Sequence, residues 1–176
     1  VEYHRQGSAA SQFVPGDIDV PWLTNARHLH ATGVFPAISD ACHDTAQRAM
    51  LLMREGGRSI SFDPNLRPAL WPAPERRRQA INDRGALAEW VLPGLEEGLF
   101  LTGQSTPEGI ARFYRDRGAK LVVVKLGPEG AYFEGDAGIG WVPGFPVAQV
   151  VDTVGAGDGF AVGVISALLA GCTAEQ

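Results

Sequence analysis

Leu121-Val122-Val123-Val124 is an uninterrupted apolar run that lies between Lys120 and Lys125. A strand with one face in water alternates apolar and polar residues, whereas a strand covered on both faces is apolar throughout. Strands of the second kind are typical of parallel sheets with a helix layer on each side. The run therefore predicts a buried strand over 120–126 in a protein of the α/β class.

Outward from this strand, strand-like and helix-like segments alternate along the whole chain. Such alternation with short connections predicts an open α/β sheet, and these sheets bind ligands beyond the carboxyl ends of their strands. Asp17 is a candidate cap for a short helix that runs toward Asn25. Strands are predicted at 1–5, 27–33, 58–63, 90–92, 120–126 and 147–151, and helices at 40–55, 74–89, 95–101, 106–118 and 157–171.

Composition and charge exclude several classes of function. A net charge of −5 argues against nucleic acid or an anionic membrane as a partner, and no apolar run could span a bilayer. Cys42 and Cys172 form no CxxC pair, which favours reduced thiols and a cytoplasmic location. His28 and His30 share one strand face without a third ligand in view, so we interpret them as packed or hydrogen-bonded rather than metal-binding.

The stretch Asp152-Thr153-Val154-Gly155-Ala156-Gly157-Asp158-Gly159-Phe160 precedes an apolar helix. Free backbone amides at a helix N-terminus bind anions, and Gly155 and Gly157 let a phosphoryl group approach the backbone. Asp158 would repel phosphate, but it has a role if it takes a proton from a hydroxyl that attacks phosphorus. On these residues alone, the alternative is that Asp158 only stabilises the first helical turn.

This stretch, D-T-V-G-A-G-D-x-F, resembles the second signature of the PfkB carbohydrate kinases. The resemblance implies a ribokinase-like fold, with an open, mostly parallel sheet and helices on both faces. It also implies ATP as the phosphoryl donor, Asp158 as the catalytic base, and the amides of Gly155, Ala156 and Gly157 as the anion hole.

Asp63-Pro64-Asn65-Leu66-Arg67, followed by Leu70-Trp71, comes after a predicted strand. Alone, Arg67 could bind a phosphate or carboxylate through its planar fork, or it could be an ordinary surface arginine. The segment is similar to the D-x-N-x-R-x-x-L-W motif of the family's ketodeoxygluconate and related kinases. That similarity implies that Arg67 reaches the sugar acid or the transferred phosphate and that Asn65 lies near the nucleotide phosphates.

Tyr3-His4-Arg5, followed by Gly7-Ser8-Ala9, resembles the Y-x-R-x-G-S-A segment of 2-keto-3-deoxygluconate kinases. The resemblance implies that Tyr3 and Arg5 contact the substrate, and an arginine suits a sugar that carries a carboxylate. The alternative for these residues is an edge strand with exposed polar groups.

Two further segments carry the same resemblance. Pro93-Gly94-Leu95-Glu96-Glu97 matches the position of the family's N-x-x-E motif, which implies that Glu97 helps to hold hydrated Mg²⁺, although Gly94 stands where Asn is usual. The alternative for Glu97 is a solvated carboxylate on a helix. Lys125-Leu126-Gly127-Pro128-Glu129-Gly130 resembles the family's G-x-x-G turn, which implies that Lys125, Gly127 and Gly130 lie beside the ribose and phosphates of ATP.

The resemblance covers residues 1–176 but only the central and C-terminal catalytic portion of the family's domain. The lid and the opening sugar-binding region have no counterpart, and the chain begins without Met, so we expect a fragment that is inactive alone. The predicted function of the full-length protein is ATP-dependent phosphorylation of a sugar-acid hydroxyl, 2-keto-3-deoxygluconate to its 6-phosphate. Alternatives are fructose, ribose or 5-keto-2-deoxygluconate as substrate, or a non-catalytic nucleotide-binding fragment. A kinase of this kind is compatible with a homo-oligomer of the full-length protein.

Overall fold

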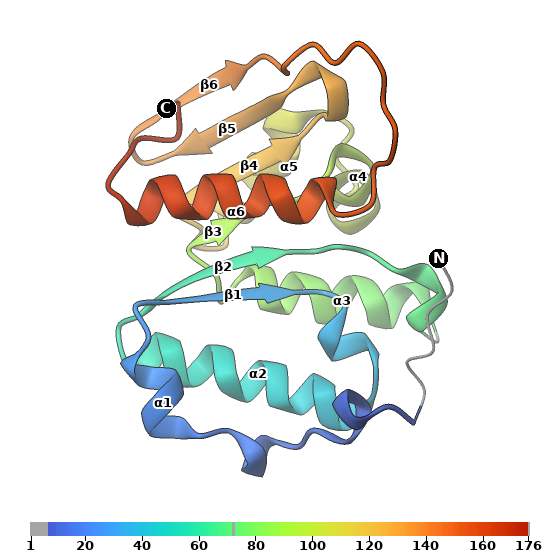
Figure 1. The fold of residues 1–176 in the computed structure, drawn as a ribbon, viewed down its shortest axis with the longest axis vertical. Coiled ribbons are helices and arrows are strands. Elements are labelled where there is room, and N and C mark those ends of the chain that lie inside the picture. The colour runs from blue at the N-terminus through green and yellow to red at the C-terminus, as the bar shows by residue number, and fades with distance from the viewer. Residues whose placement is uncertain (1–6, 72, 176) are drawn as a thin grey trace.

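A six-stranded sheet runs through the molecule in the order β1-β2-β3-β4-β5-β6 (Figure 1). The computed structural model describes residues 7–71 and 73–175. Strands β1 to β4 pair in parallel, and β5 and β6 join them as an antiparallel hairpin. The predicted open, mostly parallel sheet is therefore confirmed. The strands are β1 (His28–Thr32), β2 (Ser59–Asp63), β3 (Trp90–Val91), β4 (Leu121–Lys125), β5 (Ala131–Gly135) and β6 (Gly138–Val142).

Helices cover both faces of this sheet, as the sequence predicts. Residues of α1 to α5 share one apolar cluster with the sheet, and α6 packs on the opposite face (Figure 1). The α-helices are α1 (Val20–Asn25), α2 (Asp40–Glu55), α3 (Pro74–Gly85), α4 (Leu95–Thr102), α5 (Pro107–Arg115) and α6 (Ala156–Leu169). Short 3-10 segments are Ala9–Gln12, Pro15–Asp17, Phe35–Ala37, Pro68–Leu70 and Gly127–Glu129.

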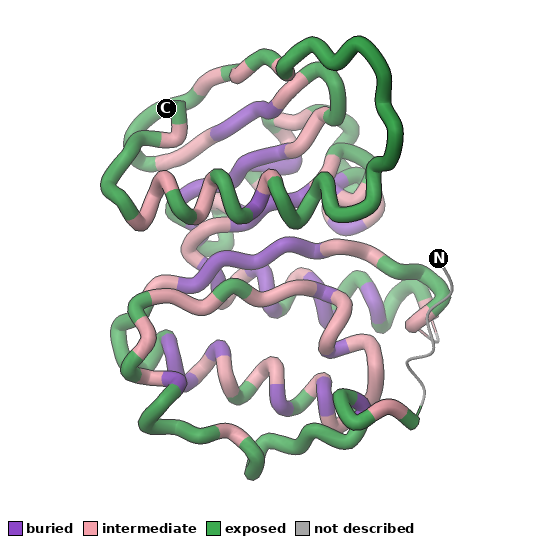
Figure 2. Tube along the Cα trace, in the orientation of Figure 1, coloured by how far each residue is buried: buried purple, intermediate pink, exposed green. Residues whose placement is uncertain are grey.

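The apolar run of β4 supplies residues to both layers. Val122 and Val124 belong to the cluster under α2, α3, α4 and α5, whereas Leu121 and Val123 pack with Ala161 of α6. Because successive side chains of a strand point to opposite faces, a strand between two helix layers needs an apolar residue at every position. Figure 2 shows the resulting buried segments in the central strands.

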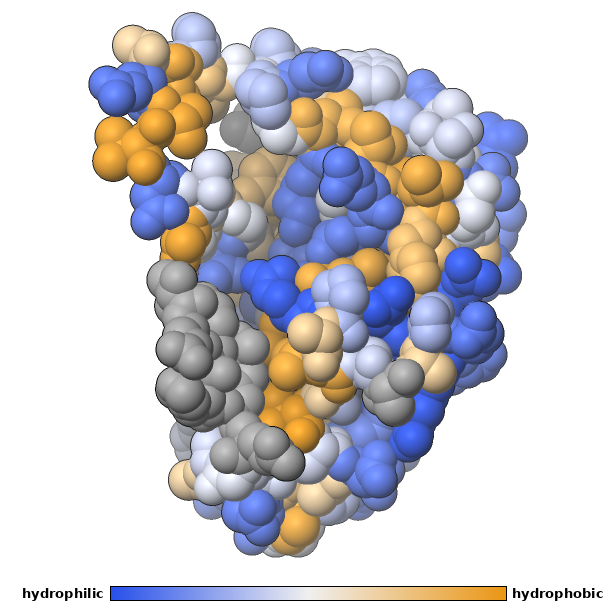
Figure 3. Space-filling view, turned by 90° about the vertical axis from the view of Figure 1, so that its right-hand side faces the viewer, coloured by the Kyte–Doolittle hydropathy of each residue, from blue (hydrophilic) through white to orange (hydrophobic). Residues whose placement is uncertain are grey.

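The carboxyl ends of the parallel strands reach the same side of the molecule (Figure 1). Figure 3 looks onto this side, where hydrophilic residues gather near the middle of the face. On β2, Ile60 and Phe62 belong to the apolar cluster, while Ser61 and Asp63 alternate with them and are also buried. Asp63 is therefore a buried carboxylate at the end of a central strand.

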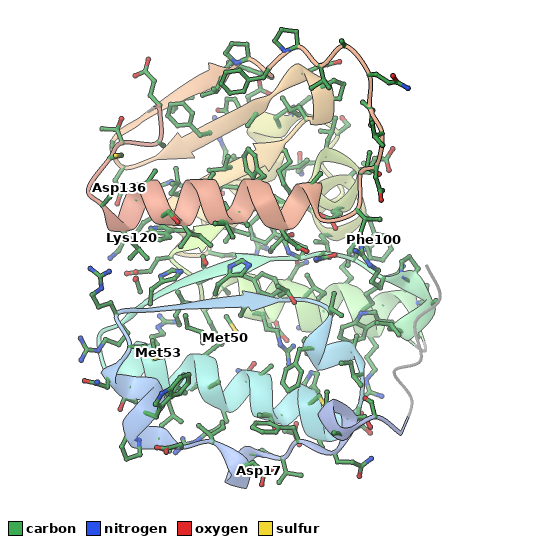
Figure 4. All side chains as sticks on the ribbon, viewed as in Figure 1. Asp17, Met50, Met53, Phe100, Lys120 and Asp136 are labelled. Carbon is green, nitrogen blue, oxygen red and sulfur yellow. The ribbon has the colours of Figure 1, made fainter. Side chains whose placement is uncertain are left out.

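Local contacts explain where the first two helices begin and which side of α2 is buried. Ser39 caps α2 by accepting a hydrogen bond from the Cys42 amide at 3.1 Å, and Met50 and Met53 lie on the side of α2 that faces the sheet (Figure 4). The cap of α1 is Asp19, whose carboxylate accepts from Trp22 N at 3.0 Å. The prediction that Asp17 caps this helix was wrong, because the Asp17 carboxylate instead accepts from Val14 N at 3.0 Å.

Several element boundaries differ from the sequence prediction by a few residues, and a helix end and a missing strand differ most. Helix α3 ends at Gly85 rather than at residue 89, because the amide of Glu89 donates to Ile60 O of β2 and strand β3 begins at the next residue. The apolar segment 147–151 forms no strand, and Val147, Val150 and Val151 are exposed. Within the described residues this segment pairs with no strand, although the outer edge of β6 is free.

Candidate active site

A polar cavity of about 420 Å³ opens where the ends of β2 and β4 meet the start of α6. It brings together segments that are far apart in the sequence. Most of the site residues predicted from the sequence line it. The lining residues are Asp63, Asn65, Arg67, Glu97, Lys125, Thr153, Val154, Gly155, Gly157 and Asp158.

The turn before α6 presents bare backbone to this cavity. Gly155 is the N-cap of α6 and has φ +78°, a left-handed conformation that glycine adopts without steric cost. The amide of Ala156 donates to Thr153 O at 3.1 Å, so this predicted anion-hole amide is engaged within the turn. Gly157, which has no side chain to block the approach, lines the cavity directly.

Asp158 lies in the first turn of α6, is exposed, and lines the same cavity. Its carboxylate is thus beside the Gly155–Gly157 turn rather than packed into the core. A carboxylate at a helix N-terminus is stabilised by the helix dipole, and one that also faces an open cavity can contact a bound molecule. The geometry is compatible with Asp158 as a proton acceptor.

The loop after β2 carries Asn65 and Arg67. Asn65 has φ +39°, and its amide donates to Asp63 Oδ1 at 3.1 Å, an Asx-type contact that holds the loop in this conformation. Arg67 is exposed, and among the described residues its guanidinium donates one hydrogen bond, to Leu66 O at 3.1 Å. Because a guanidinium carries five N–H donors, Arg67 keeps donors for an anion in the cavity.

Glu97 is held by two backbone amides from different segments. Its Oε1 accepts from Leu66 N at 2.7 Å, and its Oε2 accepts from Gly94 N at 2.9 Å. The residue that replaces the usual Asn, Gly94, therefore still contacts Glu97 through its backbone. Each carboxylate oxygen keeps a further lone pair for a metal-bound water.

Lys125 and Asp63 form an ion pair inside the cavity, with 2.7 Å between Nζ and Oδ2. Burial raises the pKa of Asp63 above its usual value, and the neighbouring Lys125 opposes that rise. Sequence reasoning gave Asp63 no role of its own. The two residues lie 62 positions apart, so the available signal was only a carboxylate and an ammonium at the ends of predicted strands.

Gly127 and Gly130 line a second, mostly apolar cavity of about 430 Å³ between α6 and strands β4 to β6. Gly130 has φ +102°, and a Cβ there would lie 2.0 Å from Val142 O, so only glycine fits. Val123 and Gly127 of this apolar cavity lie two positions before and two positions after Lys125, which lines the polar cavity. A molecule with an apolar ring and an anionic end could occupy both.

Tyr3 and Arg5 lie outside the described residues. His28 and His30 hydrogen-bond to Ser59 and Ser61, as expected for structural histidines. Within residues 7–71 and 73–175, no group of three or more His, Cys, Asp and Glu side chains is placed to hold a metal ion. None of the helices in these segments is long and apolar enough to cross a membrane.

The profile of the pfkB family carbohydrate kinases matches residues 2–176 of the chain. The chain belongs to this family. A pfkB relative, the 2-dehydro-3-deoxygluconokinase of Bacillus subtilis (strain 168), is 50% identical over 171 residues, which are 97% of this chain and 53% of the relative. The chain therefore spans about half the length of this curated relative.

Solved structures agree with the pfkB assignment. The crystal structure of a PfkB protein from Polaromonas sp. JS666 has a TM-score of 0.93 and 66% identity, and the match covers 99% of this chain and 57% of that one. A protein described as ribokinase II from E. coli, solved with ATP and Mg²⁺, has a TM-score of 0.86 and 29% identity, covering 97% and 54%. These neighbours confirm the ribokinase-like fold.

Proposed function

We propose that the natural protein containing this chain transfers the terminal phosphoryl group of ATP to a hydroxyl of 2-keto-3-deoxygluconate, giving the 6-phosphate. One observation carries the proposal: Asp158, Arg67 and Lys125 line a single polar cavity with the bare turn at Gly155 and Gly157. A proton acceptor, cationic donors and a phosphate-sized backbone site are the parts that phosphoryl transfer to an alcohol requires.

In the proposed reaction, Asp158 accepts the proton of the attacking sugar hydroxyl. The hydroxyl oxygen forms a bond to the γ-phosphorus of ATP, and the bond from that phosphorus to the β–γ bridging oxygen breaks, which leaves ADP. The Gly155–Gly157 turn and the dipole of α6 stabilise the negative charge on the moving phosphoryl group. Arg67 supplies further N–H donors to the phosphoryl group or to the sugar carboxylate.

The two cavities support the placement of ATP. The apolar cavity beside Gly127 and Gly130 suits the adenine ring and ribose, and the polar cavity suits the phosphates. Lys125 lines the polar cavity, ends β4 and precedes the turn at Gly127, which lines the apolar cavity. Asn65 lies on the phosphate side of this arrangement.

The donor set also fits a hydrated Mg²⁺. Glu97 and Asp158 are two carboxylates at the polar cavity, and Mg²⁺ usually keeps several waters while binding one or two carboxylates. Glu97 would hold such an ion through water, since its oxygens already accept two backbone amides. When bound, Mg²⁺ neutralises phosphate charge.

The substrate part of the proposal is supported by the relative that is 50% identical and by the arginines. Arg67 lies at the cavity, and the sequence resemblance adds Tyr3 and Arg5 as substrate contacts. Arginine binds a carboxylate with two parallel hydrogen bonds, a contact that a neutral sugar cannot make. A sugar acid therefore uses this site more fully than fructose or ribose would.

The test is a coupled assay of ADP release by the natural protein that contains this chain. The panel is 2-keto-3-deoxygluconate, 5-keto-2-deoxygluconate, fructose and ribose, each with ATP and Mg²⁺. We expect the highest kcat/KM with 2-keto-3-deoxygluconate. Faster turnover of a neutral sugar would reject the substrate assignment, and no turnover of any sugar would reject the kinase proposal.

A further inference from the structure

The Asp63–Lys125 ion pair joins two strands that do not touch. β2 and β4 are separated by β3, and neighbouring strands lie about 4.8 Å apart, so the two backbones are roughly 10 Å apart. Lys125 must therefore extend its side chain across the end of β3 to reach Asp63 Oδ2 at 2.7 Å. The side chain of Asp63 is 2% exposed and that of Lys125 18%, so the pair is shielded from solvent on one side and open to the cavity on the other.

The ammonium of Lys125 lies beside the turn that begins α6. A Cβ placed on Gly157 would lie 3.9 Å from Lys125 Nζ, the nearest described atom outside the glycine's own turn of helix. Gly157 and Lys125 also line the same cavity. The cation is therefore next to the backbone at which the proposed function puts the moving phosphoryl group.

Both oxygens of Asp63 have partners. Oδ1 accepts from the amide of Asn65 at 3.1 Å, and Oδ2 accepts from Lys125. A carboxylate held in this way at the end of a buried strand has little freedom to move. Because burying an ion pair costs about as much free energy as the pairing returns, stability alone gives little reason for a buried pair here.

We propose that Asp63 is a positioning residue that holds the Lys125 ammonium over the Gly155–Gly157 turn, where the lysine neutralises the terminal phosphate of ATP during transfer. This inference rests on the proposed function. Lys125 is the group that contacts the phosphate, and Asp63 acts only through Lys125. The competing explanation is an ion pair that merely closes the end of the sheet.

A double-mutant cycle in the natural protein separates the two explanations. The variants are Lys125→Met, Asp63→Asn and their combination. The matched control is Lys120→Met, which removes the ion pair of 2.5 Å between Lys120 and Glu89 at the opposite end of β4 (Figure 4 labels Lys120). Each protein is assayed for kcat with saturating ATP and sugar acid, well below its melting temperature.

We expect Lys125→Met to lower kcat about 100-fold, the usual effect of removing one donor to the developing charge. Asp63→Asn should lower kcat about tenfold, and the double variant should be no slower than Lys125→Met, because Asp63 has no separate function. Lys120→Met should keep the parental kcat. The proposal would be overturned if Asp63→Asn kept the parental kcat. It would also be overturned if the two losses of kcat multiplied in the double variant, because Asp63 would then act independently of Lys125.

A binding measurement provides a second readout that does not depend on turnover. The dissociation constant of AMP divided by that of ATP should fall about tenfold in Lys125→Met and in Asp63→Asn, but not in Lys120→Met. The reason is that only the terminal phosphates contact Lys125, so these variants weaken the binding of ATP and not that of AMP. An equal ratio in all four proteins would overturn the proposal. If Asp63→Asn does not fold, Asp63→Glu, which moves the anion by one methylene, replaces it with the same expectation.

The parent protein distinguishes this inference from the proposed function. An active parent whose variants keep its kcat leaves the kinase function in place and rejects the role of Asp63. A parent that phosphorylates no sugar rejects the kinase function, and the ratio of dissociation constants then decides whether Asp63 positions Lys125.

Discussion

Glu97 accepts a hydrogen bond of 2.7 Å from the amide of Leu66, although 31 residues separate them in the sequence. The other oxygen of Glu97 accepts from the Gly94 amide at 2.9 Å. One carboxylate thus ties the loop that carries Asn65 and Arg67 to the start of α4. A residue proposed to hold Mg²⁺ through water also fixes the loop that we propose contacts the phosphates.

Replacing Glu97 with Gln should therefore have two effects. The amide side chain has one acceptor atom, so either the Leu66 or the Gly94 N–H loses its partner. We expect the free energy of unfolding to fall by about 1–3 kcal/mol, and the Mg²⁺ concentration for half-maximal activity to rise. Denaturant unfolding and an Mg²⁺ titration of activity measure these changes.

The matched control for this variant is Glu96→Gln. Glu96 is exposed on the same helical turn, and its side chain makes neither of these contacts. It should change both quantities little. Equal stability and equal Mg²⁺ dependence of the two variants would contradict the dual role of Glu97.

Asp158→Asn should keep ATP binding and lose turnover. Asn has the same shape but cannot accept the hydroxyl proton, and the loss of a general base lowers kcat by about 10²–10⁴-fold. The control is Asp116→Asn, which neutralises an exposed carboxylate at the end of α5. Steady-state kinetics and calorimetric titration with ATP provide the two readouts, and a parental kcat for Asp158→Asn would show that another group takes the proton.

Much of the site could be predicted because its motifs follow strands. Each motif stands after a segment whose apolar pattern indicates a strand or at the start of one that indicates a helix, and parallel strands end on the same side of a sheet. These motifs supply Asn65, Glu97, Lys125 and Asp158. The cavity confirms that these residues come together. Their chemical roles stay predictions.

The contacts between the motifs could not be predicted. The Asp63–Lys125 pair depends on β3 lying between β2 and β4, and a pattern of apolar residues does not specify strand order. The bond from Ala156 N to Thr153 O depends on the left-handed conformation of Gly155. The segment 147–151 has a strand-like pattern, but a strand also needs a neighbour, which the local sequence does not reveal.

Gly130→Ala should destabilise the fold more than the same change at another left-handed glycine. Gly130 has φ +102°, and its new Cβ would lie 2.0 Å from Val142 O. Gly57, with φ +65°, has open space around the corresponding position. We expect Gly57→Ala to cost about 1–2 kcal/mol of unfolding free energy. Gly130→Ala should cost clearly more, because the backbone at Val142 must also shift. Equal losses in denaturant unfolding would show that the Val142 contact relaxes freely.

The ring nitrogens of His28 lie 2.8 Å from Ser59 Oγ and 2.8 Å from Ser61 Oγ, and the ring stacks on Trp90 with 4.8 Å between centroids. Burial lowers the pKa of His28 below its usual value of 6.5, His30 adds to this effect, and Glu89 opposes it. The unfolded chain therefore binds a proton at a higher pH than the folded protein does. Stability should consequently be lost as the pH falls through 6.5 toward the lower folded-state pKa.

Replacing His28 with Gln removes this titration while keeping a side chain that can hydrogen-bond to the serines. The loss of unfolding free energy between about pH 7.5 and about pH 5.5 should be smaller in His28→Gln than in the parent. Ser59→Ala is the control, because it removes one hydrogen bond and leaves the titrating ring. It should lower the free energy of unfolding at both pH values by a similar amount, so that the change between the two pH values stays as in the parent. If denaturant unfolding showed the same change of unfolding free energy with pH for His28→Gln and the parent, protonation of His28 would not be coupled to folding. The contacts with the two serines would then have to persist around a charged ring.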